Sequence, residues 1–349
     1  MRHVRAMTAA ALLLAGSLAA CASGEAATEG SGGTVAAKEG LHIGVAYAVG
    51  GRGDRSLNDS AFAGASWAAD ELGGEVRDLS PNADASNRAD LLTQLADEGY
   101  NPIIAVGSAY GDHIGDVVAQ YPETTFAIVD SSVVEIGADN LTGLLFADEE
   151  SSFLAGVAAA LKTETDHVGF IGGVEIRSIQ TYEAGYVAGV AAVNPDIEVD
   201  VQYISPVGDF SGFVDAPRGQ IVAQGMFDGG ADIVYHAAGG AGLGVFRAAA
   251  ASEGLAIGAV SDQYETVDDE ELRAVIMTST LKRVDRALQG FLTCFVHGSV
   301  PGGEDVVDDL ETRGVDLATS GGRIDDIADQ IDEFRQQILA GEIEVPTIP

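Results

Sequence analysis

Cysteine and basic residues are scarce in this sequence, and each shortage excludes a class of protein. Cysteine occurs only as Cys21 and Cys294, so no disulfide inside the chain can form if Cys21 is modified. Lysine and arginine number 18 against 54 aspartates and glutamates, which gives a formal net charge of −36. A surface this acidic repels phosphate backbones and anionic lipid headgroups. The composition therefore argues against a nucleic-acid partner and against membrane adhesion other than through an anchor.

Motifs for metal, cofactor and covalent chemistry are also missing. The sequence contains no H-E-x-x-H, C-x-x-C or G-x-S-x-G pattern, and its histidines show no metal-ligand spacing. Beyond residue 21, no stretch is long enough and apolar enough to be a transmembrane helix. We therefore expect no metal, no cofactor and no catalytic centre.

An export signal is predicted at the N-terminus. Arg2 and Arg5 precede an apolar run over residues 9–14, and the segment closes on LAAC at residues 18–21. A charged start and an apolar core too short to span a bilayer are typical of a secretory signal. The LAAC ending resembles a bacterial lipobox, which implies cleavage before Cys21 and its lipidation; the alternative is an ordinary signal with a chance cysteine. We predict a signal peptide over residues 1–20, a flexible tether over 21–40, and anchoring to the extracytoplasmic face of the cell membrane.

From residue 41 onward, apolar strands alternate with amphipathic helices. Strands are predicted over residues 41–49, 102–106, 125–130, 168–171, 199–204, 232–236, 255–260 and 275–279, and helices over 60–72, 85–98, 110–120, 150–161, 178–193, 216–227, 243–251, 283–297 and 324–340. Strands joined by helical crossovers form parallel sheets covered on both faces. The number of units exceeds one comfortable sheet, so we expect an α/β protein of two doubly wound lobes with a hinge and a cleft. Lobe 1 is predicted over residues 41–147 with a return segment at about 264–300, and lobe 2 over 148–263 with a C-terminal segment at about 301–349.

Residues 229–246 are predicted to form a strand, a glycine-rich turn and the start of a helix. In GGADIVYHAAGGAGLGVF (residues 229–246), a buried strand runs into a turn containing Gly240 and Gly242, and a helix follows. Such a turn lets a ligand approach bare backbone N–H groups at the carboxyl end of a strand. The alternative is that the glycines only allow the helix to pack close to the sheet, and neither phosphate-binding glycine motif is satisfied in this stretch.

The order of seven segments resembles one known family. These segments are GGRGDRSLNDSAFAG (50–64), FAIVD (126–130), SSFLAG (151–156), VGFIGG (168–173), GADIVYHAAGGAGLGVF (230–246), SDQ (261–263) and TSTLKRVD (278–285). From about residue 41 to the C-terminus, the chain is similar to the basic membrane protein family of ABC-transporter substrate-binding lipoproteins, whose well-understood members bind purine nucleosides. The resemblance implies a type I periplasmic-binding-protein fold with two Rossmann-like lobes. It also implies a monomer that serves an ABC permease and ATPase.

The resemblance carries a set of ligand-binding residues onto this sequence. The matching positions are Asp54, Asn58, Phe62, Asp130, Phe213, Gly240, Gly242, Asp262 and Lys282. By this comparison, Asp130 and the aromatic rings would recognise the base, while Asp262 and Lys282 would recognise the ribose. The second aromatic is open between Phe213 and Phe210, because GDFSGFVD departs from the family's G-S-F-x-D pattern.

Each of these residues has a structural alternative. Asp54 is suited to capping the helix that follows, Asp130 to a turn, and Phe62 to a helical core position. Tyr182 and His236 are interpreted as a core residue and a hydrogen-bonded structural histidine. Two other functions remain open: a sensor lipoprotein that binds a sugar or another small signalling molecule, and, less favoured, a nucleoside-processing enzyme.

Overall fold

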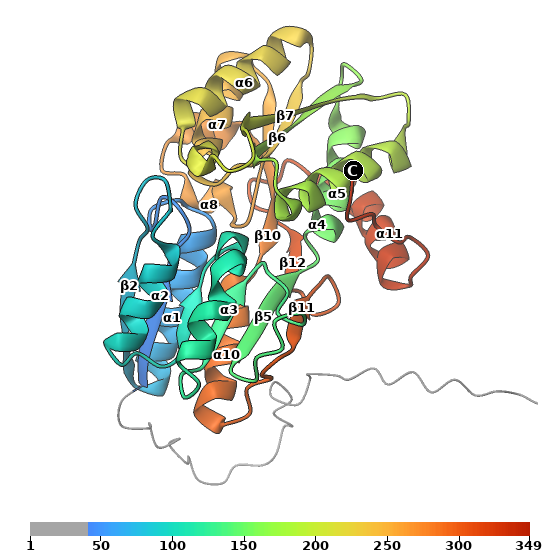
Figure 1. The fold of residues 1–349 in the computed structure, drawn as a ribbon. Coiled ribbons are helices and arrows are strands. Elements are labelled where there is room, and N and C mark those ends of the chain that lie inside the picture. Colours follow the sequence, from blue (N-terminus) through green and yellow to red (C-terminus); the bar gives the residue numbers. More distant parts are fainter. Residues whose placement is uncertain (1–40) are drawn as a thin grey trace, which may run out of the picture. The chain divides into compact units, whose positions relative to one another are not determined.

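The computed structural model describes residues 41–349, and within that range the chain forms two six-stranded sheets flanked by helices (Figure 1). The predicted signal peptide, the tether and Cys21 lie outside the described residues. The α/β class predicted from the sequence is confirmed. Within residues 41–349, none of the helices combines the length and the apolarity needed to cross a bilayer.

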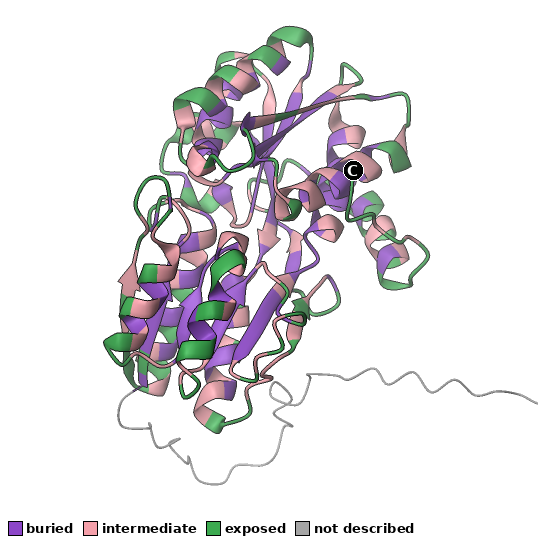
Figure 2. Ribbon diagram, in the orientation of Figure 1, coloured by how far each residue is buried: buried purple, intermediate pink, exposed green. Residues whose placement is uncertain are grey.

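The first sheet is parallel throughout. Its strands lie in the order β11 (Asp305–Asp308), β5 (Leu141–Phe146), β4 (Phe126–Val129), β3 (Ile103–Ala105), β1 (Leu41–Ala46) and β2 (Gly74–Leu79). Helices α1 (Leu57–Leu72) and α10 (Val284–His297) pack together on one face, and α2 (Arg88–Asp97) and α3 (Gly111–Gln120) cover the other. The central strands are buried on both faces, which explains their continuous apolar runs (Figure 2).

The second sheet repeats this plan with one reversed edge strand. Its order is β12 (Val315–Leu317), β10 (Ile276–Lys282), β9 (Leu255–Gly258), β8 (Ile233–Ala237), β6 (His167–Val174) and β7 (Glu198–Ser205), with only β12 antiparallel. Helices α4 (Asp148–Lys162) and α5 (Arg177–Val193) pack on one face, and α6 (Ala216–Gly229) and α7 (Gly242–Ala251) on the other. The short helices α8 (Gln263–Thr266) and α9 (Glu270–Ala274) follow β9, and α11 (Ala328–Leu339) packs against α4.

The chain passes between the two sheets more than once. It leaves the first sheet after β5, returns with α10 and β11, and crosses again to β12. The segment that rejoins the first sheet therefore begins near residue 284, whereas the sequence analysis placed its start at about 264. The intervening strand β10 pairs with β9 and β12 in the second sheet, because its apolar run continues the parallel order there.

Four strands escaped the sequence analysis, and three of them are sheet edges. β2, β11 and β12 are edge strands, and β2 and β11 are polar or only partly buried, so they lack the apolar run that identifies a central strand. The fourth, β5, reads LTGLLF, and its glycine interrupts the apolar pattern.

Helices α4 and α5 approach each other backbone to backbone. A Cβ added at Gly189 on α5 would overlap the carbonyl oxygen of Phe153 on α4, and one at Gly156 on α4 would overlap that of Tyr186 on α5. Glycine at these positions is therefore required by the close approach of the two helices.

We predict that Gly189→Ala destabilises the protein, since the added methyl group forces the two helices apart. The expected loss is about 1–3 kcal/mol of the free energy of unfolding, measured by urea denaturation. Gly290→Ala on α10 is the matched control, because nothing lies within 4 Å of its added Cβ. An alanine there should raise stability by about 0.5–1 kcal/mol, as in any exposed helix interior. Equal effects of both changes would contradict the packing argument.

Candidate functional site

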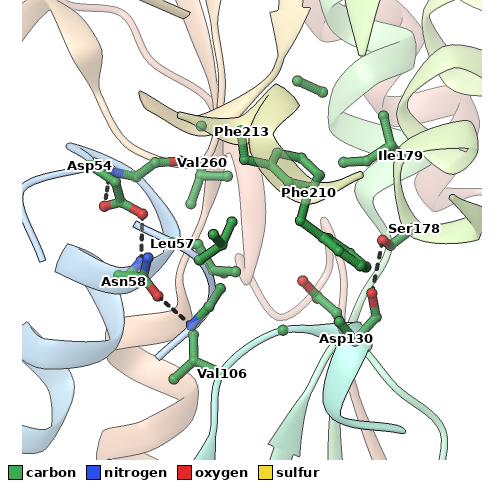
Figure 3. Close-up of a pocket in the computed structure, with 18 of the residues that line it drawn as sticks. Asp54, Leu57, Asn58, Val106, Asp130, Ser178, Ile179, Phe210, Phe213 and Val260 are labelled. Atoms are coloured by element: carbon green, nitrogen blue, oxygen red, sulfur yellow. Dashed lines mark hydrogen bonds between the residues drawn. The ribbon is translucent and has the colours of Figure 1, made fainter. Parts of the chain in front are cut away.

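A cavity opens where the carboxyl ends of strands from both sheets face each other (Figure 3). Ligands of open α/β sheets bind at this end of the strands. The first sheet contributes Ala48, Val49, Asp54, Ser56, Leu57, Asn58, Arg88, Val106, Gly107, Ser108, Ala109, Tyr110 and Asp130, and the second contributes Ile176, Ser178, Ile179, Tyr182, Phe210, Phe213, Ala237, Gly239, Gly240, Ala259, Val260 and Lys282. Most of these groups are apolar, so the few polar side chains decide which ligand fits.

Both candidate aromatics line the cavity. Phe210 and Phe213 begin and end the 3₁₀ turn η2 (Phe210–Phe213), whose start is capped by the Asp209 carboxylate accepting from the Ser211 N–H at 3.0 Å. A 3₁₀ helix has three residues per turn, so side chains three apart project from the same face. The ring centroids lie 6.5 Å apart with planes inclined by 26°. The choice that the sequence left open therefore has no single answer, since both rings form one aromatic surface.

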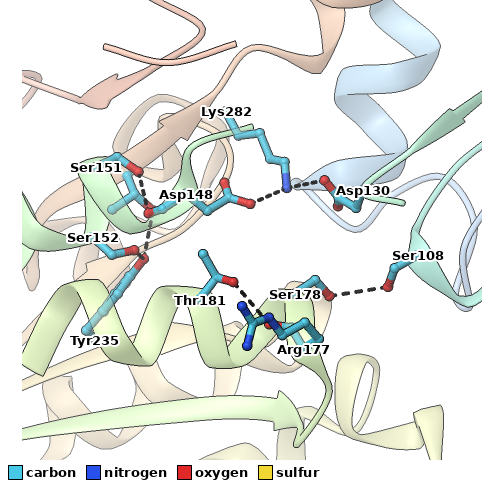
Figure 4. A network of polar contacts seen from close by, with 11 residues as sticks. Ser108, Asp130, Asp148, Ser151, Ser152, Arg177, Ser178, Thr181, Tyr235 and Lys282 are labelled. Atoms are coloured by element: carbon cyan, nitrogen blue, oxygen red, sulfur yellow. Dashed lines mark hydrogen bonds and ion pairs between the residues drawn. The ribbon is translucent and has the colours of Figure 1, made fainter. Parts of the chain in front are cut away.

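A buried lysine joins two carboxylates at the base of the cavity. The Lys282 Nζ lies 2.6 Å from Asp130 Oδ1 and 2.7 Å from Asp148 Oδ2, and the lysine is only 3% exposed (Figure 4). Asp130 follows β4, Asp148 begins α4, and Lys282 ends β10. The ammonium group thus connects the first sheet, the second sheet and the helix at the crossing between them. Asp148 was not identified from the sequence, where it reads as an ordinary acidic residue of a helix N-terminus.

The charges of this cluster perturb one another. Burial raises the pKa of Asp148 to about 6, because the Lys282 charge that lowers it only partly offsets the loss of solvent and the repulsion from Asp130. Burial by itself would lower the pKa of Lys282, but the two carboxylates outweigh it and raise this pKa above its ordinary value. Lys282 is therefore a permanent cation, and the three-residue cluster carries a net negative charge near neutral pH.

The polar residues after β1 hold their loop in place. The Asp54 carboxylate accepts from the backbone N–H groups of Ser56, Asn58 and Asp59 at 2.9, 2.9 and 3.2 Å. The Asn58 side chain accepts from the Ala48 N–H at 2.9 Å and donates to the Gly51 carbonyl at 3.1 Å. Both residues line the cavity. Asp54 also caps the start of α1, as the structural alternative for this residue proposed.

Phe62 and Asp262, both carried over from the resemblance, lie away from the cavity. Phe62 is one helical turn beyond Asn58 and packs beneath the Arg52 guanidinium, 4.2 Å from its ring centroid. Asp262 accepts the Ser320 hydroxyl at 2.6 and 2.7 Å and faces an adjoining groove next to α8, which shares Ser56, Val260 and Lys282 with the cavity. Lys282 also lines this groove, but its ammonium group pairs with Asp130 and Asp148 and not with Asp262.

The glycines of the turn after β8 have two different roles: some line the cavity, and one allows close packing. Gly239 and Gly240 line the cavity, with Gly239 in the left-handed region at φ +52°. Gly242 does not line it; an added Cβ there would overlap the ring of His236 beneath the turn. Ligand approach thus applies to the first two glycines, and close packing to Gly242.

His236 and Tyr182 are both buried, but neither matches its sequence-based interpretation in full. His236 is fully buried beside Phe246, as expected of a structural histidine, but neither ring nitrogen has a partner at normal hydrogen-bond geometry; Gln263 is the polar side chain that faces it. Burial lowers the pKa of His236 to about 4, which keeps it neutral. Tyr182 is buried as predicted, but it also lines the cavity, with its ring centroid 5.6 Å from the Lys282 Nζ.

Contacts across the cavity join the two sets of strand ends. Ser108 Oγ lies 3.3 Å from Ser178 Oγ, and the Arg55 Nε donates to the Thr266 carbonyl at 2.9 Å. Two residues that end strands here, Asp130 and Val260, have φ values of +67° and +71°. Such conformations cost about 1–3 kcal/mol each, although positions away from the cavity, such as Asp166 and Glu253, adopt them as well. The apolar periodicity of the sequence does not predict these contacts or these backbone conformations.

A second polar cluster lies at the opposite ends of β6 and β7. The ligand atoms of His167, Glu198 and Asp200 fall within 4.8 Å of one another. The His167 Nε2 lies 3.1 Å from Asp200 Oδ2, and a hydrogen bond between these two groups accounts for the arrangement without a metal ion.

The buried cluster predicts a specific pH dependence. The pKa of Asp148 is about 6 in the folded protein against 3.8 ordinarily, so between these values the native state binds more protons than the unfolded state. Its contribution to the free energy of unfolding therefore falls as pH rises through this interval, by up to about 1.4 kcal/mol per pH unit. Asp148→Asn keeps an acceptor for Lys282 and removes this contribution.

The measurement is the stability difference between parent and Asp148→Asn, from urea denaturation at several pH values from 4 to 8. The difference should shift in favour of the variant as pH rises to about 6 and stay constant above about pH 7. Asp116→Asn, at an exposed position on α3, is the control and should show no such trend. A difference that does not vary with pH would contradict the assignment.

Comparison with known proteins agrees with this architecture. The family model described as "ABC transporter substrate-binding protein PnrA-like" (Bmp) matches residues 42–348. The CD4+ T-cell-stimulating antigen of Listeria monocytogenes is 35% identical over 322 residues, covering 86% of this chain and 87% of the relative. The ABC transporter nucleoside-binding protein BmpA of Lactococcus lactis is 34% identical over 363 residues, covering 99% of each chain.

A solved structure shows the same fold. The ABC transporter solute-binding protein of Aeropyrum pernix superimposes with a TM-score of 0.76 at 27% identity, covering 88% of this chain and 93% of that one. The family resemblance noted in the sequence and the predicted type I periplasmic-binding-protein fold are thereby confirmed.

Proposed function

Because this chain belongs to the Bmp family of PnrA-like ABC-transporter substrate-binding proteins, we propose that its cavity captures a purine nucleoside for delivery to an ABC permease. The observation that carries the proposal is the combination of two near-parallel phenylalanine rings with a fixed carboxylate–ammonium pair in one mostly apolar cavity. The name of the Lactococcus lactis relative supports a nucleoside as the ligand class. The role of such a protein is binding and not catalysis.

The aromatic surface suits a flat base. Phe210 and Phe213 present their rings on the same side of the cavity, and stacking of a base on an aromatic side chain contributes about 1–3 kcal/mol. An apolar wall that includes Leu57 and Ile179 completes a slot that excludes water around such a ring. A pentose or hexose alone would leave this surface without a partner.

The charge of the lining suits a neutral ligand. Asp54 and Asp130 carry negative charge into the cavity, Arg88 and Lys282 carry positive charge, and the two signs balance among the lining residues. Asp148, directly behind Lys282, adds a further negative charge. A phosphate group would therefore meet repulsion, whereas the hydroxyl and amide groups of a nucleoside find both acceptors and donors.

Asp130 and Lys282 are the groups best placed to recognise a polar ligand. The Asp130 carboxylate has one oxygen on the ammonium group and keeps acceptor capacity for ligand N–H or O–H groups. Lys282 has three donors, of which the two carboxylates occupy two. The third donor remains for a ligand oxygen at the cavity floor.

Purine nucleosides should stabilise the protein against heat. A ligand at about 100 times its Kd raises the free energy of unfolding by about 2.7 kcal/mol. Guanosine, inosine and adenosine should therefore raise the Tm by several degrees in a thermal-shift assay, and ribose and arabinose should not. A clear shift with a pentose and none with any of the three nucleosides would overturn the proposed ligand and favour a sugar-binding receptor.

Two aspartates serve as variant and control for the same test. Asp130→Ala should weaken guanosine by well over tenfold in a calorimetric titration, because it leaves the buried Lys282 with one carboxylate fewer and removes the ligand acceptor. Asp262→Ala, which lies outside the cavity, should bind guanosine like the parent. Severe loss on Asp262→Ala would restore the ribose-binding role implied by the family resemblance.

We further propose that lipidation of Cys21 anchors the protein on the extracytoplasmic face of the membrane, as the LAAC motif indicates. Cys21→Ser should move the protein from the membrane fraction to the soluble fraction after cell fractionation. The apolar segment over residues 9–14 is unchanged in this variant, so the variant should still be exported. Its presence outside the cytoplasm is the control. Retention of the variant in the membrane fraction would refute the anchor.

A further inference from the structure

Arg88 is a cavity residue whose guanidinium makes no hydrogen bond to any residue in the described part of the chain. It begins α2 and lines the cavity, and its guanidinium lies 4.9 Å from the Phe210 ring centroid. Its Nε is buried without a hydrogen-bond partner, and no hydrogen bond or ion pair joins the Arg88 side chain to another residue in the range 41–349. Every other charged side chain at the cavity is held by the protein: Asp54 by backbone N–H groups, and Asp130 and Lys282 by each other.

An arginine left in this state points to a ligand with acceptors. A buried donor without a partner destabilises the protein unless something else satisfies it. The guanidinium is a planar fork that matches two neighbouring acceptors in one plane, whereas a single hydroxyl uses only part of it. On a purine, the O6 and N7 atoms of guanine and hypoxanthine form such a pair, and adenine instead presents an amino group beside N7.

The stacking geometry brings such a base within reach of the fork. Arg88 lies over the face of Phe210, which belongs to the aromatic surface on which we place the base. Because Arg88 covers one part of this surface, a base stacked on the remaining part has its edge next to the guanidinium. Figure 3 shows Phe210 between Phe213 and the side of the cavity where Asp130 lies. Phe210, one of the two rings of the proposed base platform, thus lies next to the carboxylate that can accept the base's N1–H.

We propose that Arg88 reads the O6/N7 edge of the base and makes the cavity selective for 6-oxopurine nucleosides, guanosine and inosine, over adenosine. This inference rests on the proposed function and names its substrate class. With adenosine, the amino group at C6 would face the donors of Arg88, and the buried Nε would lose its acceptor. Arg88 is a specificity residue in this assignment, and the apolar and aromatic contacts are common to all three nucleosides.

Calorimetric titration of the parent and Arg88→Met with guanosine, inosine and adenosine tests the proposal. The parent should prefer the two 6-oxopurines by about five- to 150-fold, the discrimination typical of a bidentate arginine contact. Arg88→Met keeps an apolar side chain over Phe210 but loses the fork, so it should lose that preference mainly through weaker guanosine and inosine binding. Arg88→Gln should also lose the preference, and it serves as the second variant if the methionine variant does not fold.

Arg52→Met is the matched control. Arg52 also lies over a phenylalanine ring, 4.2 Å from the Phe62 centroid, but outside the cavity, so its replacement should leave the preference unchanged. On the ligand side, 7-deazaguanosine lacks the N7 acceptor and should bind the parent more weakly than guanosine does. Arg88→Met should bind both compounds alike, a readout that requires no comparison of protein stabilities.

The outcomes separate this inference from the proposed function. If the parent binds all three nucleosides equally, or if Arg88→Met weakens all three by the same factor, the specificity role is wrong while nucleoside binding stands. If the parent binds none of the three, the proposed function and this inference both fail. Loss of preference in Arg88→Met with retention in Arg52→Met supports the assignment.

Discussion

One buried ammonium group is the constraint on which the rest of the site depends. Lys282 ends a strand of the second sheet, Asp130 follows a strand of the first, and Asp148 begins the helix at the crossing between them. A lone ammonium and a lone carboxylate are each penalised by burial, and two carboxylates at this distance repel each other. The three groups are therefore stable only together, so the position of β10 relative to β4 is tied to the charges at the base of the cavity. Removing Lys282 would leave two buried carboxylates that repel each other.

The remaining polar groups divide between building the cavity and facing its contents. Asp54 and Asn58 use their hydrogen bonds on the loop after β1, and the Ser108–Ser178 and Arg55–Thr266 contacts join the strand ends of the two sheets. Tight α4–α5 packing supports this frame from the side of the second sheet. What remains for a ligand is a short set of groups on rigid elements: the two phenylalanine rings, part of the Asp130–Lys282 pair, and the guanidinium of Arg88.

The sequence analysis identified those cavity residues that lie in recognisable local motifs. It missed those whose place at the cavity depends on how distant elements pack together. The polar loop, the carboxylate after FAIVD, the lysine and the glycine turn were all identified, and each of these except Gly242 lines the cavity. Phe62 was misplaced because it lies one helical turn further along α1 than Asn58, beyond the residues that line the cavity. Asp148 and Arg88 were missed because an acid or a base at the start of a helix is common and carries no signal of its partners. The polar edge strands β2 and β11 were missed for a similar reason, since pairing with a neighbour and not their own apolarity makes them strands.

By itself, the sequence determined the α/β class and the alternation of strands and helices, because apolar periodicity is a local property of the chain. It also determined membership of a family of binding proteins, because the family's short motifs can be recognised in the sequence alone. Only the tertiary structure decided that Lys282 pairs with Asp130 and Asp148 and not with Asp262, that both Phe210 and Phe213 line the cavity, and that Arg88 has no partner within the described residues. The reason is that charge pairing and burial depend on distances between residues more than a hundred positions apart. A lysine between two buried carboxylates has the same local sequence as a lysine in solvent, and only the packing of two sheets makes them different.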